Sequence, residues 1–540
     1  MGRPPFTEVA TLGDLLLRSA QEHPDRKALV LPNQAVTFAE LEKAASQVAR
    51  ALLSLGVSPG QHVAVLIPNC VEFAATLFGI SLVGAVAIPL NVRNRSTELR
   101  YIIANSEAVA MITSDDPADP VDFVATLEEA FPDLDDGPAD APGLRHLLLV
   151  RGNDRGPFVG ADRFLGYAAK VTGDELEEQR RRIRVRDPAL IIYTSGTTAS
   201  PKGCVLSHEA LTRGPVERSR YRLSAGDHNV TWGAGPLYHI GSLAPFIGSI
   251  GVAGTYVTDT FFDSERALRL MEQHGVTLAW PWFSAIVQGL IDHPTFDPSR
   301  LPHLRYLFMI APPTLVDRVQ DVLPRTEVLQ ACGMTETAGI FALCEPDEDR
   351  RSRSTTNGKP SPGVEVRIVD PESGAERADG IMGEIWVRGY NVMDRYWASP
   401  EKTAESLTED RWLRTGDLYT RLPGGSLIFG GRCKDMLKVG GENVAAIEVE
   451  AFLCTHPAVK IAEVVGRPDP RLDEVPVAFI ELRDASKADE AELIAHCKGR
   501  IANYKVPRAV HFMTADDWPM SATKIDKRAL RLRLERNEDA

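Results

Sequence analysis

Strand-length apolar runs alternate with helix-length amphipathic segments along the first third of the chain, and this alternation limits the fold more than any other feature. Thr37 and Glu40 form a capping-box pattern, after which apolar residues recur at helical spacing. Short apolar runs over 63–67 and 85–88 predict strands, and the segment 71–82 between them predicts a helix. This rhythm is typical of βαβ units and therefore predicts an α/β fold with mostly parallel strands.

The chain is long enough for at least two domains, because its 540 residues exceed what one hydrophobic core usually supports. Asp, Pro and Gly are concentrated over 132–143, which predicts a surface loop, and a second break falls over 424–434. We therefore expect a large multi-sheet N-terminal domain over 1–432 and a small α/β domain over 433–540. The pattern in this second domain predicts a helix over 446–453, a strand over 475–482 and a helix over 490–501.

Charge and cysteine usage argue against several classes of protein. The formal net charge is −14, whereas a nucleic-acid scaffold needs a basic face. The sequence has no apolar run of the length that a membrane span needs, and its first residues lack a secretory signal pattern. The seven cysteines form no C-x-x-C pair, so neither a zinc site nor a disulfide framework is indicated. We therefore expect a cytoplasmic protein without a membrane span.

The segment 193–203 carries the strongest local signal for chemistry. It is rich in Ser, Thr and Gly and follows a buried apolar run over 189–192, so it leaves a strand as a loop. Gly196 and Gly203 allow a ligand to approach the backbone closely, and the nearby hydroxyls and lysine suit a polyphosphate. The spacing is not that of a Walker A loop, because Pro201 stands where that motif has its second glycine, and a solvated loop is the alternative interpretation. The candidate phosphate-binding residues are Thr194, Ser195, Gly196, Thr197, Thr198 and Lys202.

This segment resembles the phosphate-binding signature of the acyl-CoA synthetase, adenylation-domain and luciferase superfamily, with Ala199 where the family usually has glycine. The resemblance spans nearly the whole chain. It implies that ATP activates a carboxylic acid as its acyl-AMP, and that the acyl group then passes to coenzyme A. Further segments match the family's motifs in the family's order: the substrate-side motif at 236–243, the adenine and magnesium motif at 333–337, the ribose motif at 413–418, the hinge motif at 431–435 with its continuation to 444, and the catalytic-lysine loop at 519–525.

The resemblance also implies a role for each matching residue. Glu336 is the expected Mg²⁺ ligand, since hard oxygen donors suit that ion. Asp417 is expected to accept from the ribose hydroxyls, and Arg432 offers a rigid fork of donors to ribose or phosphate oxygens. Lys524 is the expected catalytic group, because an ammonium between the carboxylate and the α-phosphate would stabilise the transition-state charge. The ATP-binding set is completed by Gly333, Met334 and Thr335.

Several positions depart from the family's pattern. Cys332 precedes Gly333, where the family usually has an aromatic residue that stacks on adenine. Thr523 directly precedes Lys524, whereas the family usually has one more residue between them, so Lys527 is the competing catalytic lysine. Further departures are Ala446, where Pro is common, and the segment 309–313, which is usually Gly-rich.

The acyl pocket is expected beside the substrate-side motif and an aromatic run at 280–283, which follows a strand-like segment at 276–279. Core packing is an equally good interpretation of this aromatic run. If the run lines a pocket, a flat aryl or short-chain acid fits better than a long acyl tail. The candidate pocket residues are Tyr238, His239, Trp282, Phe283, Met309 and Ile310.

A mobile lid is the last implication of the resemblance. Lys434 matches the hinge position, and rotation about it would replace Lys524 at the active site by a face that carries Lys438 and Gly441. Gly441 would let the pantetheine arm of coenzyme A pass closely. The expected ligands are therefore ATP, Mg²⁺, coenzyme A and a small carboxylic acid, and the oligomeric state stays open.

Three alternative functions remain at this stage. The acyl group could pass to a carrier-protein thiol, or ATP could activate nitrite for the diazotisation of an arylamine. A nucleotide-binding regulator without turnover is supported by Cys332 and by the shortened lysine loop. The retained Glu336, Asp417 and Lys524 favour an enzyme.

Overall fold

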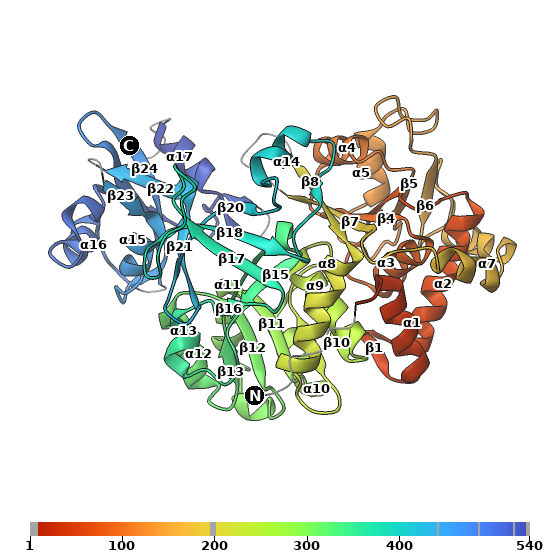
Figure 1. Ribbon diagram of the computed structural model, residues 1–540, viewed down its shortest axis with the longest axis horizontal. Coiled ribbons are helices and arrows are strands. Elements are labelled where there is room, and N and C mark those ends of the chain that lie inside the picture. Colours follow the sequence, from red (N-terminus) through yellow and green to blue (C-terminus); the bar gives the residue numbers. More distant parts are fainter. Residues whose placement is uncertain (1–8, 195–200, 440–441, 484–485, 522–523, 536–540) are drawn as a thin grey trace. The chain divides into compact units, whose positions relative to one another are not determined.

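The computed structural model describes residues 9–194, 201–439, 442–483, 486–521 and 524–535 (Figure 1). The chain forms two compact units. Unit 1 consists of Met1–Glu365 and Val387–Leu413, and unit 2 consists of Val366–Trp386 and Arg414–Ala540. The expected division into domains at 432/433 stays a prediction. Among the described residues, no helix has both the length and the apolar character needed to cross a membrane.

Unit 1 contains a seven-stranded sheet with the order β19-β8-β7-β4-β3-β5-β6. Strands β7 to β6 of this order are parallel, and β8 and β19 complete one edge in antiparallel pairing. The strands are β3 (His62–Leu66), β4 (Val86–Pro89), β5 (Ala110–Thr113), β6 (His146–Leu149), β7 (Pro188–Thr194), β8 (Lys202–Ser207) and β19 (Arg395–Tyr396). The helices are α2 (Phe38–Ser54), α3 (Val71–Val83), α4 (Ser96–Asn105), α5 (Phe123–Ala130), α6 (Ala161–Gly166) and α7 (Gly173–Arg180), with the 3₁₀ turn η1 (Tyr167–Lys170).

The local signals in this part of the sequence are confirmed. Helix α2 begins with the predicted capping box, since the Thr37 hydroxyl accepts from the Glu40 backbone N–H and the Glu40 carboxylate accepts from that of Thr37. Strands β3 and β4 flank α3 as the alternation predicts, and the residues between α5 and β6 form the predicted loop. Sequence pattern and local backbone geometry therefore agree here.

A second seven-stranded sheet in unit 1 has the order β13-β12-β11-β9-β10-β1-β2. Its neighbouring strands are parallel except β1 and β2, which pair antiparallel at the edge. Trp280 and Phe308 enter one buried cluster and Ala279 and Met309 another, so both faces of the sheet are covered. The strands are β1 (Lys27–Leu31), β2 (Gln34–Thr37), β9 (Val230–Gly233), β10 (Thr255–Val257), β11 (Leu278–Phe283), β12 (Tyr306–Ile310) and β13 (Glu327–Leu329). The helices are α1 (Leu12–Glu22), α8 (His208–Glu217), α9 (Ile240–Gly251), α10 (Ser264–Gln273), α11 (Ser284–Ile291) and α12 (Pro313–Val322), with the π-helix η2 (Arg218–Arg222) and the 3₁₀ turn η3 (Pro298–Arg300).

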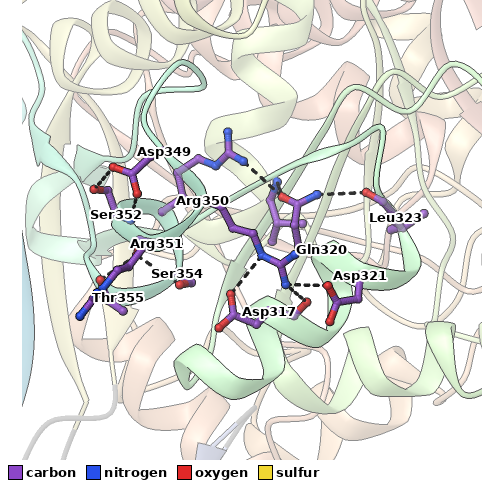
Figure 2. Close-up of polar contacts among 12 residues, drawn as sticks. Asp317, Gln320, Asp321, Leu323, Asp349, Arg350, Arg351, Ser352, Ser354 and Thr355 are labelled. Carbon is purple, nitrogen blue, oxygen red and sulfur yellow. Dashed lines mark hydrogen bonds and ion pairs between the residues drawn. The ribbon is translucent and has the colours of Figure 1, made fainter.

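A small antiparallel sheet, β14-β15-β16, follows in the chain. Next to it, α12 and α13 (Arg350–Thr355) form a corner held by polar contacts (Figure 2). The Arg350 guanidinium contacts the carboxylates of Asp317 and, at 2.7 Å, Asp321, and Asp349 caps the start of α13 by accepting from Ser352. This corner joins α12, which precedes the small sheet in the chain, to α13, which lies between β15 and β16. The strands are β14 (Ala331–Met334), β15 (Gly339–Leu343) and β16 (Lys359–Pro360), with the turn η4 (Thr335–Thr337).

A four-stranded sheet has the order β17-β18-β20-β21. Its residues 366–386 and 414–432 belong to unit 2. Its strands are β17 (Val364–Val369), β18 (Gly383–Gly389), β20 (Leu413–Arg421) and β21 (Leu427–Arg432), and α14 (Pro400–Ser406) precedes β20 in the chain.

The C-terminal part of unit 2 is a small α/β fold. Its sheet has the order β23-β22-β25-β24, with β26 paired to β25. Helix α15 has the predicted bounds, whereas α16 ends earlier than predicted, because Gly499 takes a φ of +72° that helix continuation does not allow. The strands are β22 (Met436–Val439), β23 (Glu442–Ala445), β24 (Val459–Asp469), β25 (Asp473–Leu482), β26 (Ala509–Met513), β27 (Met520–Ser521) and β28 (Lys524–Ile525). The helices are α15 (Ala446–Leu453), α16 (Glu490–Cys497) and α17 (Lys527–Glu535), with the turns η5 (Cys433–Asp435) and η6 (Asn503–Lys505).

Candidate active site

The candidate phosphate-binding loop connects two paired strands. Thr194 at the end of β7 lies opposite Lys202 at the start of β8, so the loop leaves and returns at the same point of the sheet. Close packing favours glycine at Gly203, because a Cβ there would stand 2.7 Å from the Ile191 side chain. Both Thr194 and Lys202 are partly exposed. The candidates Ser195, Gly196, Thr197 and Thr198 lie outside the described residues.

Glu336, the candidate magnesium ligand, lies in the turn η4 directly after β14. Its carboxylate is buried, and Oε1 accepts a 2.7 Å hydrogen bond from the Tyr396 hydroxyl. Its backbone carbonyl accepts from the N–H of Met393 at 2.8 Å, and the side-chain amide of Asn391 donates to the Thr337 carbonyl at 3.2 Å. The segment leading into β19 therefore fixes both the backbone and the carboxylate of this motif.

Tyr396 also contacts β8, the strand that follows the candidate phosphate-binding loop. It pairs with Cys204 in the β8–β19 ladder, and the Lys202 ammonium lies 5.2 Å from the centre of its ring. Burial and the neighbouring Glu336 carboxylate raise the pKa of Tyr396 well above its usual range, so the hydroxyl stays protonated and donates. One tyrosine thus contacts a candidate phosphate-binding lysine and the candidate magnesium ligand, which lie far apart in the sequence.

The candidate adenine-binding segment is accessible to solvent. Gly333 is exposed and Met334 and Thr335 are partly exposed, whereas Cys332 is only 4% exposed. The buried Cys332 thiol offers no aromatic face to adenine, and nothing in the structure explains this departure from the family. A Cβ on Gly333 would stand 2.4 Å from the backbone oxygen of Gly339, so the β14–β15 hairpin requires glycine there.

Tyr238 and His239 lie together in the loop between β9 and α9. Their rings are 5.1 Å apart, and Tyr238 is buried. The buried Asn69, which follows β3, holds this loop: its Nδ2 donates to the Gly235 carbonyl at 3.1 Å, and its Oδ1 accepts from the Leu237 N–H at 2.7 Å. Asn69 is a structural determinant of the site that the sequence motifs did not indicate.

The other pocket candidates lie at the adjacent ends of β11 and β12. The register pairs Trp282 with Met309 and Phe283 with Ile310. Trp282 takes a φ of +64°, which is unusual for a residue with a Cβ. Met309 is buried, whereas Ile310 is 40% exposed. The strand begins at Leu278, later than expected, and includes the aromatic run itself, because β9 and β12 pair with it there.

Trp280 shows that part of this aromatic run is core. It is 3% exposed and stacks on Phe308 with ring centres 3.9 Å apart and planes 11° apart. Core packing therefore applies to Trp280. Trp282 and Phe283 are partly exposed, and their role in a pocket stays a prediction.

The ribose candidates meet in unit 2. Asp417 and Arg432 are direct neighbours across β20 and β21, and Arg432 Nε lies 3.0 Å from Asp417 Oδ1. Gly416 turns the chain with a φ of +70°, and its N–H donates to Glu384 at 2.8 Å. Asp417 is mostly buried and Arg432 more exposed, so the pair presents donors and an acceptor at one place.

The lid candidates occupy the expected segments of unit 2. Lys434 lies in η5, between β21 and β22, and Lys438 lies on β22. Lys524 begins β28 and pairs with Ser521 of β27, so it follows the turn of a short hairpin. Gly441 and Thr523 lie outside the described residues.

Lys527, the competing catalytic lysine, forms ion pairs with two carboxylates. Its ammonium contacts the Glu450 carboxylate closely and lies 3.2 Å from that of Glu463. Its side chain is mostly buried between these two acids. These contacts leave Lys524 as the stronger catalytic candidate.

The comparison with protein families settles the identity of the fold. The model for the AMP-binding enzyme family matches residues 16–397, and the model for the AMP-binding enzyme C-terminal domain matches residues 448–524. The chain belongs to the AMP-binding enzyme family. This confirms the family that the sequence motifs predicted.

Relatives of this AMP-binding enzyme match over almost the full length. It is 32% identical over 540 residues to the putative acyl-CoA synthetase YngI of Bacillus subtilis, covering 97% of this chain and 96% of the relative. It is 33% identical over 536 residues to the 3-[(3aS,4S,7aS)-7a-methyl-1,5-dioxo-octahydro-1H-inden-4-yl]propanoyl:CoA ligase of Mycobacterium tuberculosis, covering 97% and 99%. Among solved structures, ATP-bound MatB from Rhodopseudomonas palustris is 26% identical with a TM-score of 0.83, covering 97% of this chain and 99% of that chain. These similarities confirm the predicted α/β fold class.

Proposed function

We propose that this AMP-binding enzyme is an ATP-dependent carboxylic acid:CoA ligase, which forms an acyl-AMP with release of pyrophosphate and then an acyl-CoA thioester with release of AMP. The observation that carries the proposal is the contact of both Lys202 and Glu336 with Tyr396 beside the end of the phosphate-binding loop. A cation and a carboxylate held by one side chain suit a metal-bound polyphosphate. The similarity to CoA ligases supports coenzyme A as the acceptor.

The first half-reaction has to bring a carboxylate to the α-phosphorus of a polyanion. Repulsion between the anions opposes this approach, so cations and hydrogen-bond donors must offset it. Thr194 and Lys202 would bind the phosphates together with the loop between them. Lys524 would lie between the attacking carboxylate and the α-phosphate, and Asp417 with Arg432 would fix the ribose.

Mg²⁺ would neutralise charge on the departing pyrophosphate when it is bound. Glu336 fits the role of its protein ligand, because its carboxylate is buried and oriented by the Tyr396 hydroxyl. Mg²⁺ usually takes one or two protein carboxylates and completes its shell with phosphate and water oxygens, so a single carboxylate is sufficient.

The second half-reaction uses the alternative orientation of the lid. Rotation about Lys434 would withdraw Lys524 and present Lys438 and Gly441 to the acyl-AMP. The coenzyme A thiol then attacks the acyl carbonyl carbon, and AMP leaves. The similarity to CoA ligases over nearly the full chain supports this two-step scheme.

The acid is best described as a compact ring-bearing acid. The partly exposed Trp282 and Phe283 end β11 next to the buried Met309, and such aromatic surroundings favour a flat or fused ring over a long flexible chain. The Mycobacterium tuberculosis relative is named for a fused-ring propanoate, which supports the same class of acid.

An exchange assay tests the proposed function. We expect ATP–pyrophosphate exchange to be fastest with aryl or fused-ring acids in a panel that also holds short-, medium- and long-chain acids. Added coenzyme A should then stimulate AMP release, whereas a carrier-protein thiol, or nitrite with an arylamine, should not. Stimulation by one of these other acceptors, or ATP binding without exchange for any acid, would reject the ligase in favour of the corresponding alternative.

A further inference from the structure

Five charged side chains gather around helix α17, which follows the hairpin of Lys524 in the chain. They come from η5, α15, β24 and α17, which all belong to unit 2. The acids outnumber the bases, so the cluster carries a net negative charge when all of them are ionised. Its members are Asp435, Glu450, Glu463, Lys527 and Arg531.

Lys527 is the centre of the cluster. Its ammonium joins the Glu450 carboxylate on α15 to the Glu463 carboxylate on β24. Glu450 is itself fixed, because its Oε1 accepts from the Val464 N–H at 2.8 Å. The start of α17 is therefore tied to two different elements of the domain through one side chain.

Arg531 ties the same face of α17 to the segment at the candidate hinge. It lies one helical turn after Lys527, and its guanidinium is 2.9 Å from the carboxylate of Asp435. Asp435 directly follows Lys434 in η5. Helix α17 thus connects the residue after the hinge position with the catalytic hairpin.

The connection between Lys524 and Lys527 is short and is held by hydrogen bonds. Strand β28 ends at Ile525, and the Asp526 N–H donates to the Pro519 carbonyl at 2.7 Å, which closes the hairpin. The Asp526 carboxylate then accepts from the Arg528 N–H at 2.9 Å and caps α17. We therefore expect a shift of α17 along its axis to be passed to β28, which begins at Lys524.

Apolar packing on one side of α17 already stabilises the attachment of this helix to the rest of the domain. Leu530 is fully buried in a cluster with Val465, Phe479 and Trp518. Buried ion pairs add little net stability compared with apolar residues, and their best-attested use is to specify one register of packing. The cluster can specify the register of α17, since its ion pairs contact this helix at two positions one turn apart.

We propose that Lys527 and Arg531 are positioning residues, which fix the register of α17 and thereby place Lys524 for acyl-adenylate formation. The proposal rests on the proposed function, because it assigns Lys524 to the first half-reaction. It also explains how a hairpin with one residue fewer than the family usually has can still deliver its lysine: the helix after it is held at a defined position.

The half-reactions test this proposal. We expect Lys527→Met to lower the rate of adenylation about 10- to 100-fold, because small misplacements of a catalytic group have effects of this size. The KM values for ATP and acid, and thioester formation from added acyl-AMP, should stay within about twofold, since neither uses Lys524. Lys527→Arg should restore most of the rate. Lys505→Met is the matched control, because Lys505 pairs with Glu448 on the same helix α15, outside the cluster.

A double variant and hydrogen exchange complete the test. In a Lys524→Ala background, Lys527→Met should cost nothing further. Backbone exchange over 519–526 should rise in Lys527→Met and stay unchanged in Lys505→Met, whether or not an acid substrate is known. Unchanged exchange in Lys527→Met, or an equal loss of both half-reactions, overturns the positioning role. If Lys524→Ala adenylates normally and Lys527→Met does not adenylate, Lys527 is the catalytic lysine instead. If the unaltered enzyme shows no adenylation, only the proposed function is rejected.

Discussion

Tyr396 donates a hydrogen bond to the Glu336 carboxylate, and its ring lies under the Lys202 ammonium. The two contacts can be removed separately. Tyr396→Phe keeps the ring and deletes the hydroxyl, and the loss of a hydrogen bond to a charged group costs roughly 1.5–3 kcal/mol. We expect this variant to need about tenfold more Mg²⁺ for half-maximal pyrophosphate release, with an almost unchanged KM for ATP.

Two further variants test the role of the Tyr396 ring and the specificity of the hydroxyl effect. Tyr396→Leu should also raise the KM for ATP, because it removes the ring beneath Lys202. Tyr256→Phe removes another buried hydroxyl, which donates to the Ser242 carbonyl at 3.2 Å, and it should leave the magnesium titration unchanged. Identical titrations for Tyr396→Phe and the unaltered enzyme would show that the hydroxyl does not orient Glu336.

The role of Glu336 as a metal ligand can be tested by a variant that changes only the charge of its side chain. Glu336→Gln keeps the shape of the side chain and removes the charge that would hold Mg²⁺. We expect a large rise in the Mg²⁺ concentration required for pyrophosphate release, with little change in the KM for the acid. An unchanged magnesium titration would remove Glu336 from the metal site.

The candidate residues that lie inside motifs could be chosen from the sequence, whereas the residues that support these motifs could not. Asp417 and Arg432 come from separate motifs, and the structure brings them together across β20 and β21. Tyr396 and Asn69 have no motif of their own. Their partners are brought to them by the pairing of β19 with β8 and by the placement of the β9–α9 loop, and no local pattern encodes these long-range contacts.

At the scale of elements, the acidic pair on α15 and β24 predicts a pH dependence. Burial and the neighbouring Glu450 carboxylate raise the pKa of Glu463 from 4.5 to about 7. The folded chain therefore holds this proton more tightly than the unfolded chain. The stabilisation is complete below about pH 4.5 and is lost as the pH rises through 7. The other charged groups that act on the Glu463 carboxylate are Lys527 on α17 and Asp435 in η5.

Glu463→Gln should flatten this dependence. We expect the free energy of unfolding of the unaltered enzyme to fall by about 1–3 kcal/mol between pH 5 and pH 8 from this group, and the variant to lose that fall. The measurement is denaturant unfolding at several pH values, with Glu448→Gln, an exposed carboxylate on α15, as the control. Parallel curves for Glu463→Gln and the unaltered enzyme would contradict the raised pKa.

Element boundaries were predictable where a strong local signal sets them. The capping box starts α2, and the helix over 446–453 forms as α15. Helix α16 ends early at a glycine with positive φ, a backbone choice that the apolar periodicity does not reveal. Strand β11 includes the aromatic run because its neighbours β9 and β12 extend the ladder, which is again a tertiary effect.

At the scale of the whole molecule, the proposed mechanism requires two orientations of the lid in each cycle. A large rotation must be absorbed by a few backbone torsions, and such positions commonly lie at domain junctions. Lys434 lies in the short turn η5 between β21 and β22. The family resemblance assigns the pivot to this residue, and the torsion of its backbone can be fixed by substitution.

Lys434→Pro should therefore separate the two half-reactions. Proline fixes φ near −65°, so the lid should stay in the orientation that delivers Lys524. We expect adenylation largely to survive and thioester formation to fall sharply, because Lys438 and Gly441 can no longer reach the acyl-AMP. The readout is acyl-AMP that accumulates and stays bound when coenzyme A is added. Lys434→Ala removes the side chain without fixing the torsion, so both half-reactions should stay near normal. An equal loss of both in Lys434→Pro would indicate misfolding or another pivot, and no loss in either would exclude a rotating lid.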